Sequence, residues 1–325
     1  MRSESAFSHV PVLLEECLTG LDLREGKTYV DCTLGGGGHS LEILRRTKTA
    51  KLIGVDKDED ALRAAGERLK EFSDRITLIR RDFKETEAIL QEAGVCKVDG
   101  VLMDLGVSSF QLDCFERGFS YRAEEAPLDM RMDRRQALTA EIVVNTYDRQ
   151  QLIRVLREYG EEKFAPRIAD FILREREEKP IRTCGELVDL IYRAIPAPAR
   201  RTGGHPAKRT FMALRIEVNG ELANLKEAVR NWAMALNEGG RICVITFHSL
   251  EDRIVKHLFK ELESDCVCPP GMPVCRCGKM QEIEILTKRP VEPGAEEKEQ
   301  NPRAESAKLR IAKKVLPRKR GQKTE

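Results

Sequence analysis

The sequence predicts an α/β fold in which a doubly wound parallel sheet is interrupted by an inserted all-helical domain. The first hundred residues repeat one pattern: a short β-rich run ends in an aspartate, and a helical segment follows. From about residue 112 to residue 204, no buried strand is apparent and apolar residues recur at helical spacing. Strands that alternate with helices form βαβ units, whose parallel strands are buried on both faces. The change of period therefore marks the insert.

The expected elements follow in chain order. Four strands are predicted at residues 28–31, 51–56, 76–82 and 99–104. A helix at residues 58–72 is indicated by apolar residues three and four positions apart. The insert carries helical patterns at residues 150–159, 164–177 and 186–194. A further helix at residues 221–236 precedes two late strands, at residues 241–247 and 283–287.

The length of the chain favours more than one compact unit. Its 325 residues exceed the roughly 250–300 residues at which a single hydrophobic core stops growing. We expect the sheet domain to comprise residues 1–111 and 205–300, on either side of a helical insert at residues 112–204. Residues 301–325 are expected to form a basic C-terminal tail.

Composition excludes several classes of protein. Charged residues make up 34% of the chain, against about 25% in a typical soluble protein. The longest apolar runs are strand-sized, as at residues 242–245, and none approaches the roughly 20 residues that a membrane helix needs. The first residues lack the basic and then apolar layout of a secretory signal. We therefore exclude membrane, secreted, collagen-like and largely disordered proteins, and expect a cytoplasmic protein.

Two basic segments lie in a chain whose formal net charge is only +2. Residues 200–215 hold five basic side chains and no acidic one, and residues 303–325 hold nine basic and two acidic side chains. Such segments bind a phosphate backbone in a salt-dependent manner, so we expect the tail to be a mobile basic arm. Arg131, Arg209 and Arg253 are either surface charges or phosphate contacts, and its basic neighbours favour contact for Arg209.

Four aspartates follow or close the four predicted strands: Asp31, Asp56, Asp82 and Asp104. In open α/β sheets, ligands bind beyond the carboxyl ends of the strands, so these side chains should border one crevice. The alternative is that each aspartate caps the helix that follows it.

Four consecutive glycines, residues 35–38, separate the first strand from its helix. They permit positive φ angles and the close approach of a ligand, and the helix N-terminus favours an anionic group. Asp56 lies where a carboxylate would accept hydrogen bonds from the two ribose hydroxyls of a nucleoside. A nicotinamide dinucleotide and S-adenosylmethionine both satisfy this pattern. Asp31, at the base of the loop, would repel a pyrophosphate and therefore favours the cationic S-adenosylmethionine.

Three more residues are candidates for the same crevice. Asp104 closes the fourth strand, where the reacting atoms should meet, unless it only caps a turn. Phe83 either offers an apolar face to adenine or packs in the core. His248 follows the fifth predicted strand and is either a substrate contact or a structural histidine.

Eight sequence blocks together resemble those of a known family. They are Gly-Gly-Gly-Gly-His-Ser (35–40), Asp-Leu-Gly-Val-Ser-Ser (104–109), Glu-Arg-Gly-Phe-Ser (116–120), Pro-Leu-Asp-Met-Arg-Met-Asp (127–133), Tyr-Gly-Glu-Glu-Lys-Phe-Ala (159–165), His-Pro-Ala-Lys-Arg-Thr-Phe (205–211), Phe-His-Ser-Leu-Glu-Asp-Arg (247–253) and Asn-Pro-Arg-Ala (301–304). From residue 9 to about residue 313, the chain resembles the bacterial ribosomal small subunit methyltransferase H family. Its members are 16S rRNA (cytosine-N4)-methyltransferases with a Rossmann-like methyltransferase sheet.

The resemblance implies a cofactor, a substrate and a set of site residues. The implied cofactor is S-adenosylmethionine, and its contacts carry over to Gly37, Gly38, His39, Asp56, Phe83, Asp104 and Gln111. The implied substrate is a cytidine in the decoding region of 16S rRNA, with the helical insert helping to recognise that RNA. We expect the small ribosomal subunit as the partner, with RNA contacts from Arg131, Arg209, His248 and Arg253. The oligomeric state is left open.

Methylation of cytosine N4 requires the site to orient and activate a weak nucleophile. N4 is a weak nucleophile because its lone pair is conjugated with the ring. An enzyme can align N4 with the S–CH3 bond and accept an N4 hydrogen as positive charge develops on the nitrogen. Asp104, or a nearby backbone carbonyl, is the candidate acceptor. Many amino methyltransferases have Pro-Pro-aromatic at this point, whereas residues 105–107 are Leu-Gly-Val, so Phe110, Phe119 or Tyr121 would have to stack on the base.

Ten cysteines complete the inventory. Six are scattered, and we expect them to be reduced and buried. The other four, Cys266, Cys268, Cys275 and Cys277, form two closely spaced pairs. Four thiolates could form a tetrahedral zinc site, but cysteines within a zinc-binding pair are usually two to four residues apart rather than one. The alternatives are a structural zinc site and a reduced surface loop, and the spacing favours the loop.

Two other functions remain as alternatives to an S-adenosylmethionine-dependent RNA methyltransferase. One is a nicotinamide-dependent oxidoreductase, against which Asp31 and the basic segments argue. The other is a non-catalytic ribosome-assembly factor, against which the intact Asp56 and Asp104 argue.

Overall fold

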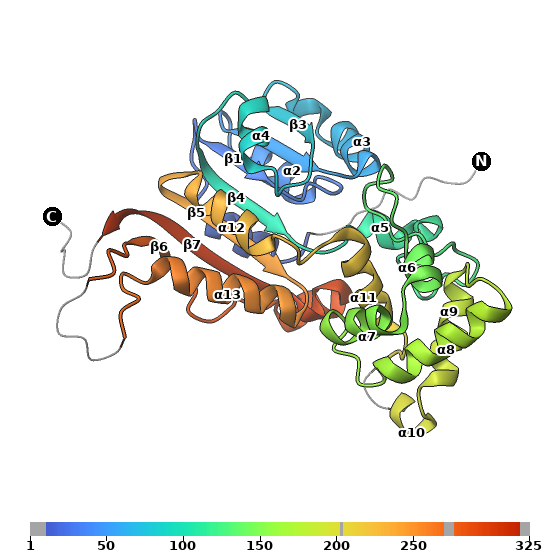
Figure 1. The fold of residues 1–325 in the computed structure, drawn as a ribbon. Coiled ribbons are helices and arrows are strands. Elements are labelled where there is room, and N and C mark those ends of the chain that lie inside the picture. Colours follow the sequence, from blue (N-terminus) through green and yellow to red (C-terminus); the bar gives the residue numbers. More distant parts are fainter. Residues whose placement is uncertain (1–10, 202–203, 270–275, 319–325) are drawn as a thin grey trace. The chain divides into compact units, whose positions relative to one another are not determined.

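The computed structural model (Figure 1) describes residues 11–201, 204–269 and 276–318. The chain divides into two compact units. We call them the sheet unit, which runs to Gly106 and resumes at Asn224, and the helical unit, which is Val107–Ala223. Among the described residues, no helix is both long enough and apolar enough to cross a membrane.

Within the described residues, seven strands of the sheet unit form one sheet in the order β3-β2-β1-β4-β5-β7-β6. Their bounds are β1 Thr28–Asp31, β2 Lys51–Asp56, β3 Ile76–Arg80, β4 Val98–Asp104, β5 Leu236–Thr246, β6 Gln281–Ile285 and β7 Lys308–Arg318. The strands from β1 to β5 are parallel, and β7 is antiparallel to both of its neighbours. The strand order reverses between β1 and β4, which makes this a doubly wound sheet and confirms the predicted fold class.

The helices of the sheet unit are α1 Leu14–Leu21, α2 Gly38–Arg46, α3 Glu59–Arg68, α4 Thr86–Glu92, α12 Leu225–Met234, α13 Ser249–Glu263 and α14 Ala295–Gln300, with 3-10 turns η1 Lys70–Phe72 and η3 Pro302–Ser306. Helices α1, α2 and α3 share a core with Leu102 and Ile245 of the sheet. Alternate strand residues such as Val101 and Val244 point to the opposite face and are also fully buried. Both faces of the sheet are therefore covered, as a parallel sheet requires.

The helical unit contains α5 Ser109–Asp113, α6 Ala140–Thr146, α7 Arg149–Glu158, α8 Ala165–Glu178, α9 Cys184–Ala194, α10 Ala197–Arg200 and α11 Lys208–Asn219, with the 3-10 turn η2 Phe115–Arg117. Its apolar side chains form a separate core. Capping boxes begin three of its helices, with Ser108 and Gln111 at α5, Asp148 and Gln151 at α7, and Thr183 and Glu186 at α9. Among its described residues there is no strand longer than the isolated bridge between Pro127 and Thr183, so the predicted all-helical character holds.

The limits of the helical unit differ from the expected 112–204. The unit runs from Val107 to Ala223, and it includes α11, which we had placed in the second part of the sheet domain. Phe211, Leu214 and Val218 of α11 are buried in the core of the helical unit. The periodicity of a helix reveals which of its faces is buried, but not which of two cores buries that face.

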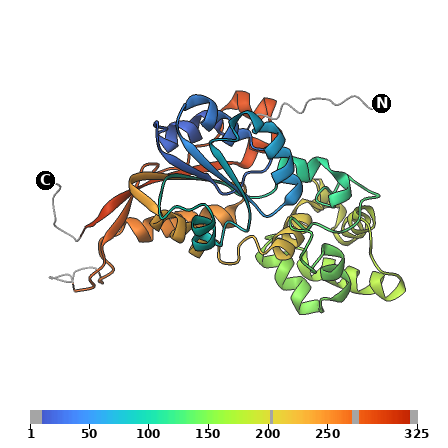
Figure 2. The same ribbon diagram turned by 90° about the horizontal axis from the view of Figure 1, so that it is seen from above.

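The predicted mobile basic arm is wrong for residues 308–318. These residues form β7, which pairs with β5 from Thr246–Lys308 to Arg241–Lys313, and the red strand lies inside the sheet in both views (Figures 1 and 2). Leu309 and Ala312 are fully buried. Two of its basic side chains are held by acids: Arg310 Nε lies 2.7 Å from Asp252 Oδ1, and Lys313 Nζ lies 2.7 Å from Glu284 Oε2. Residues 319–325 lie outside the described residues.

The scattered cysteines only partly follow the prediction that they are buried. Cys17, Cys32, Cys184 and Cys243 are buried. Cys114 is half-buried, however, and Cys96 is exposed.

Candidate functional site

The loop between β1 and α2 has the glycine-dependent geometry that the sequence predicts. Gly37 has φ 73°, and a Cβ there would lie 3.1 Å from Leu69 Cδ1. A Cβ on Gly38, the first residue of α2, would lie only 2.6 Å from Pro11 Cγ. Side chains larger than hydrogen are therefore disfavoured at both positions, by backbone conformation at Gly37 and by lack of space at Gly38. The loop leads directly to a helix N-terminus, which favours a negatively charged ligand group.

Asp31, the last residue of β1, is enclosed behind this loop. It is 1% exposed, and its carboxylate accepts hydrogen bonds from Ser40 Oγ at 2.7 Å and from the Thr33 backbone N–H at 3.2 Å. Burial raises the pKa of Asp31 to about 6, although both hydrogen bonds oppose that shift. Asp31 thus ties β1 to α2, and its negative charge acts on the site from behind the loop.

Asp56, the last residue of β2, supports the loop from the neighbouring strand. Its two oxygens accept hydrogen bonds from the backbone N–H groups of Gly35 and Asp58, each at 2.9 Å. Burial raises the pKa of Asp56 to about 6. A carboxylate has about four lone-pair positions, so two bonds leave it able to accept hydrogen bonds from a ligand as well.

Asp104, the last residue of β4, is the least satisfied acid of the site. One oxygen, Oδ1, is buried without a hydrogen-bond partner. The other, Oδ2, lies 4.0 Å from His39 Nδ1. Burial, followed by the charges of Asp31 and Glu251, raises the pKa of Asp104 to about 8. The carboxyl is therefore mostly neutral at pH 7, and a cationic or hydrogen-bond-donating ligand beside it would favour ionisation.

His39 lies in the first turn of α2 and faces Asp104. The ring is 6% exposed, and Nε2 lies 3.0 Å from the Val12 carbonyl oxygen. Because a carbonyl can only accept, Nε2 carries the hydrogen. In the neutral ring Nδ1 is then the acceptor, and it is this nitrogen that is directed toward Asp104.

The sheet register brings three of the four predicted aspartates to one edge. Asp31 pairs with Gly54 of β2 and with Leu102 of β4. Asp56 and Asp104 each lie two residues beyond those partners, at the carboxyl ends of strands adjacent to β1. Asp82 is placed differently, because β3 ends at Arg80 and Asp82 lies in the turn that follows.

Phe83 lies in the turn between β3 and α4 and is half-buried. Its carbonyl accepts a hydrogen bond from Trp232 Nε1 at 2.8 Å. Trp232 is fully buried, so this bond fixes the backbone of the turn against α12.

His248 is engaged in starting α13. Its Nδ1 accepts a long hydrogen bond from the Glu251 backbone N–H at 3.4 Å, and its Nε2 lies 3.2 Å from Glu251 Oε1. Glu251 is 2% exposed and also accepts a hydrogen bond from the Phe247 backbone N–H. This places His248 in a structural role at the helix N-terminus. Sequence reasoning missed Glu251, although the order His-Ser-Leu-Glu has the spacing of an N-terminal capping motif.

The remaining predicted residues lie in several settings. In the helical unit, Gln111 is buried in a capping box with Ser108. Arg131 donates two hydrogen bonds to the Asp129 carboxylate, at 2.7 and 2.8 Å. This ion pair stabilises the loop that contains both residues. Arg209, on α11, and Arg253, on α13 of the sheet unit, are exposed.

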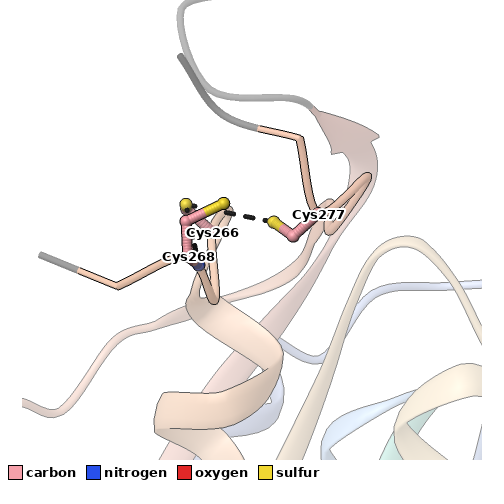
Figure 3. A group of neighbouring side chains, drawn as sticks. All are labelled: Cys266, Cys268 and Cys277. Atoms are coloured by element: carbon pink, nitrogen blue, oxygen red, sulfur yellow. Dashed lines mark hydrogen bonds between the residues drawn. The ribbon is translucent and has the colours of Figure 1, made fainter. Parts of the chain in front are cut away.

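The predicted cysteine cluster is brought together where it is described. The sulfur atoms of Cys266, Cys268 and Cys277 all lie within 4.8 Å of one another (Figure 3). Cys275 lies outside the described residues.

Comparison with known proteins assigns the chain to a family. The family model described as the MraW methylase family matches residues 6–315. The chain belongs to the MraW methylase family. Membership confirms the resemblance predicted from the eight sequence blocks and decides against the oxidoreductase alternative.

Relatives of this MraW-family chain match it over nearly their whole length. A protein of Clostridium botulinum named ribosomal RNA small subunit methyltransferase H is 54% identical over 310 residues, which cover 95% of this chain and 99% of the relative. A protein of Symbiobacterium thermophilum with the same name is 54% identical over 311 residues, with coverage of 95% and 98%. Among solved structures, an rRNA methylase from Streptococcus thermophilus is a loose match, with a TM-score of 0.40 at 10% identity over 93% of this chain and 95% of that one.

Proposed function

We propose that this MraW-family protein methylates the RNA of the small ribosomal subunit, and that its target atom is the exocyclic N4 of a cytidine in the decoding region of 16S rRNA. The relatives that are 54% identical are named ribosomal RNA small subunit methyltransferase H, which supports the substrate class. The main structural support for the proposed reaction is the Asp104 carboxyl, which has a buried, unpartnered oxygen beside the glycine loop.

The residues at the strand ends fit S-adenosylmethionine as the methyl donor. A Cβ at Gly38 would collide with Pro11, so the start of α2 depends on glycine. Asp56 has acceptor capacity for ribose hydroxyls, and the half-buried ring of Phe83 offers an apolar face for adenine. Asp31 and Asp104 supply negative charge or acceptor oxygens for the cationic parts of the donor. When bound, S-adenosylmethionine supplies an electrophilic methyl carbon on a sulfonium centre.

Asp104 then has three tasks toward the cytosine. Its Oδ1 accepts a hydrogen bond from N4 and so orients the nitrogen lone pair for attack. As the bond between N4 and the methyl carbon forms and the bond between that carbon and the donor sulfur breaks, the donor would leave as S-adenosylhomocysteine, positive charge develops on N4, and a nearby carboxylate stabilises that charge. A carboxylate whose pKa is about 8 is also a stronger base than an ordinary aspartate, so Asp104 can take up the proton that N4 loses.

The basic side chains supply contacts to RNA phosphates that do not depend on the nucleotide sequence. Arg209 on α11 and Arg253 on α13 are exposed and can reach phosphates. Arg131 forms an ion pair with Asp129, which limits its availability to RNA. Side chains of this kind neutralise phosphates and release counterions, so RNA binding by this chain weakens as the salt concentration rises.

A methylation assay with two substrates tests the proposed function. Small subunits, and their deproteinised 16S RNA, are isolated from a strain that lacks the methylase and incubated with the protein and methyl-labelled S-adenosylmethionine. We expect the label in N4-methylated cytidine of the decoding region, as read by nuclease mapping and mass spectrometry of nucleosides. Label in another nucleoside contradicts the proposed target atom, and absence of label in both substrates contradicts the proposed activity.

A further inference from the structure

The connection between α13 and β6, residues 264–280, contains a group of thiols that the methylase site does not use. No helix or strand is present in its described part. Cys266 and Cys268 come from the beginning of the connection and Cys277 from near its end (Figure 3). Their three sulfur atoms lie within 4.8 Å of one another, and none is part of a disulfide.

The distances between the sulfur atoms match those around one metal ion. In a tetrahedral zinc site with Zn–S bonds of about 2.3 Å, two sulfur ligands lie about 3.8 Å apart. The Cys266 and Cys277 sulfur atoms are 3.9 Å apart. A disulfide would require a separation of about 2.0 Å. In a [4Fe–4S] cluster each cysteine binds a different iron atom, which would hold the sulfur atoms farther apart.

Backbone N–H groups point at two of the sulfur atoms. Val267 donates a hydrogen bond to Cys277 Sγ at 3.3 Å, and Cys268 donates one to Cys266 Sγ at 3.4 Å. Outer hydrogen bonds of this kind commonly orient the ligands of metal sites. The backbone therefore holds two of the three sulfur atoms in defined positions.

In the part that the structure describes, the same connection has no apolar core that could hold it in place. None of its described residues is buried, and Val267 and Met280 are 64% and 40% exposed. Short segments that cannot bury enough apolar surface are often stabilised by a structural metal. A single ion bound by all three thiolates would join the beginning of this connection to its end.

We propose that Cys266, Cys268 and Cys277 hold a structural zinc ion that fixes the connection between α13 and β6. The proposal rests on these three ligands. The one-residue spacing of Cys266 and Cys268 argued against zinc at the level of sequence, but their sulfur atoms lie within 4.8 Å of each other and of Cys277 Sγ.

Metal content of the full-length chain tests the proposal. The protein is purified without chelator and without a metal-binding tag, and its zinc is measured by mass spectrometry of the elements. We expect one zinc per chain in the wild type and almost none in the triple variant Cys266→Ser, Cys268→Ser, Cys277→Ser. The matched control is Cys96→Ser, which removes an exposed thiol elsewhere and should keep the zinc.

Two further measurements do not depend on the folding of the triple variant. In the wild type, cobalt exchanged for zinc should give the intense sulfur-to-cobalt charge-transfer band of a tetrahedral thiolate site. Removal of the metal with a chelator should accelerate amide hydrogen exchange in residues 264–269 and 276–280 and leave β1 and β4 unchanged. The proposal is overturned if the wild type takes up no zinc under reducing conditions, if the triple variant keeps its zinc, or if anaerobic alkylation reveals a disulfide between Cys266 and Cys277.

Discussion

The carboxyl ends of β1 and β2 differ from the end of β4 in how their aspartates are satisfied. Asp31 accepts hydrogen bonds from Thr33 and Ser40, and Asp56 accepts hydrogen bonds from the backbone N–H groups of Gly35 and Asp58. Asp104 has one oxygen without a partner and a 4.0 Å approach to His39 on the other. A buried acceptor left without a donor costs about 1–3 kcal/mol. Asp31 and Asp56 therefore stabilise the loop, whereas Asp104 retains an oxygen that can bind a ligand.

Replacement of the unsatisfied acid should have the largest effect on activity. Asp104→Asn keeps the shape of the side chain but removes the negative charge and the base. We expect turnover to fall by about 10²–10³-fold, as when one stabilising group is lost from a charged transition state. Single-turnover methylation measures this effect, with the exposed Asp74→Asn as the matched control. Near-normal single-turnover rates in Asp104→Asn would remove Asp104 from the reacting centre.

The pH dependence of stability in the same variant, Asp104→Asn, tests whether the pKa of Asp104 is raised. The pKa of Asp104 is raised from 3.8 to about 8, so the folded state binds more protons than the unfolded state between these values. The stability of the wild type should therefore fall as pH rises through this range, by up to about 1.4 kcal/mol per pH unit from this group. Asp104→Asn lacks that dependence, so its stability relative to wild type should increase from pH 4 to pH 8 and then level off. Urea unfolding across the range measures the difference, and a constant difference would contradict the raised pKa.

Removal of Asp56 should affect the donor more than the chemistry. Asp56→Ala deletes the acceptor for ribose hydroxyls and frees the Gly35 N–H. Hydrogen bonds to a charged group contribute about 1.5–3 kcal/mol each, so we expect S-adenosylhomocysteine to bind about 10–100-fold more weakly. Calorimetric titration gives the dissociation constant, and thermal unfolding checks that the fold is retained. An unchanged dissociation constant in a folded variant would refute the ribose role.

Loss of a partner of Asp31 should have the smallest effect. Ser40→Ala removes the hydroxyl that donates to the Asp31 carboxylate at 2.7 Å and converts a satisfied acid into one more like Asp104. We expect a loss of about 1–2 kcal/mol in the free energy of unfolding and a further rise in the pKa of Asp31. Ser73→Ala, at an exposed position, serves as the control. Equal stability of the two variants would show that the hydrogen bond of Ser40 does not distinguish Asp31 from Asp104.

The parallel part of the sheet could be predicted because its signals are local. Short apolar runs that end in aspartate and alternate with helices of regular spacing were sufficient to place β1 to β4. The glycine loop and Asp56 could also be found, because loop chemistry and the spacing of the next acid are visible in the sequence. The roles of these residues toward a donor stay predictions.

The antiparallel strand β7 could not be predicted, because its signal is not local. Its apolar residues alternate with basic ones, and the neutralising acids, Asp252 and Glu284, come from distant parts of the chain. Read alone, the segment has the composition of a solvated arm. Only pairing with β5 reveals that Leu309 is a core residue.

The raised pKa of Asp104 could also not be predicted from the sequence. Its pKa depends on burial and on Asp31 and Glu251, which belong to different elements. The sequence gives no measure of such distances, and it left a substrate contact and a structural role both open for His248. Ser40, which satisfies Asp31, carried no signal that distinguishes it from any serine in a first helical turn.

The position of β7 between β5 and β6 has a consequence for synthesis of the chain. The Thr246 hydroxyl donates to the carbonyl of Lys308, 62 residues later, so β5 leaves the ribosome well before its partner exists. Until that partner arrives, one edge of β5 presents unpaired N–H and C=O groups, which can template pairing with another nascent chain. A stalled or prematurely terminated product would therefore be an aggregation hazard, even though it already contains every strand-end carboxylate of the methylase site.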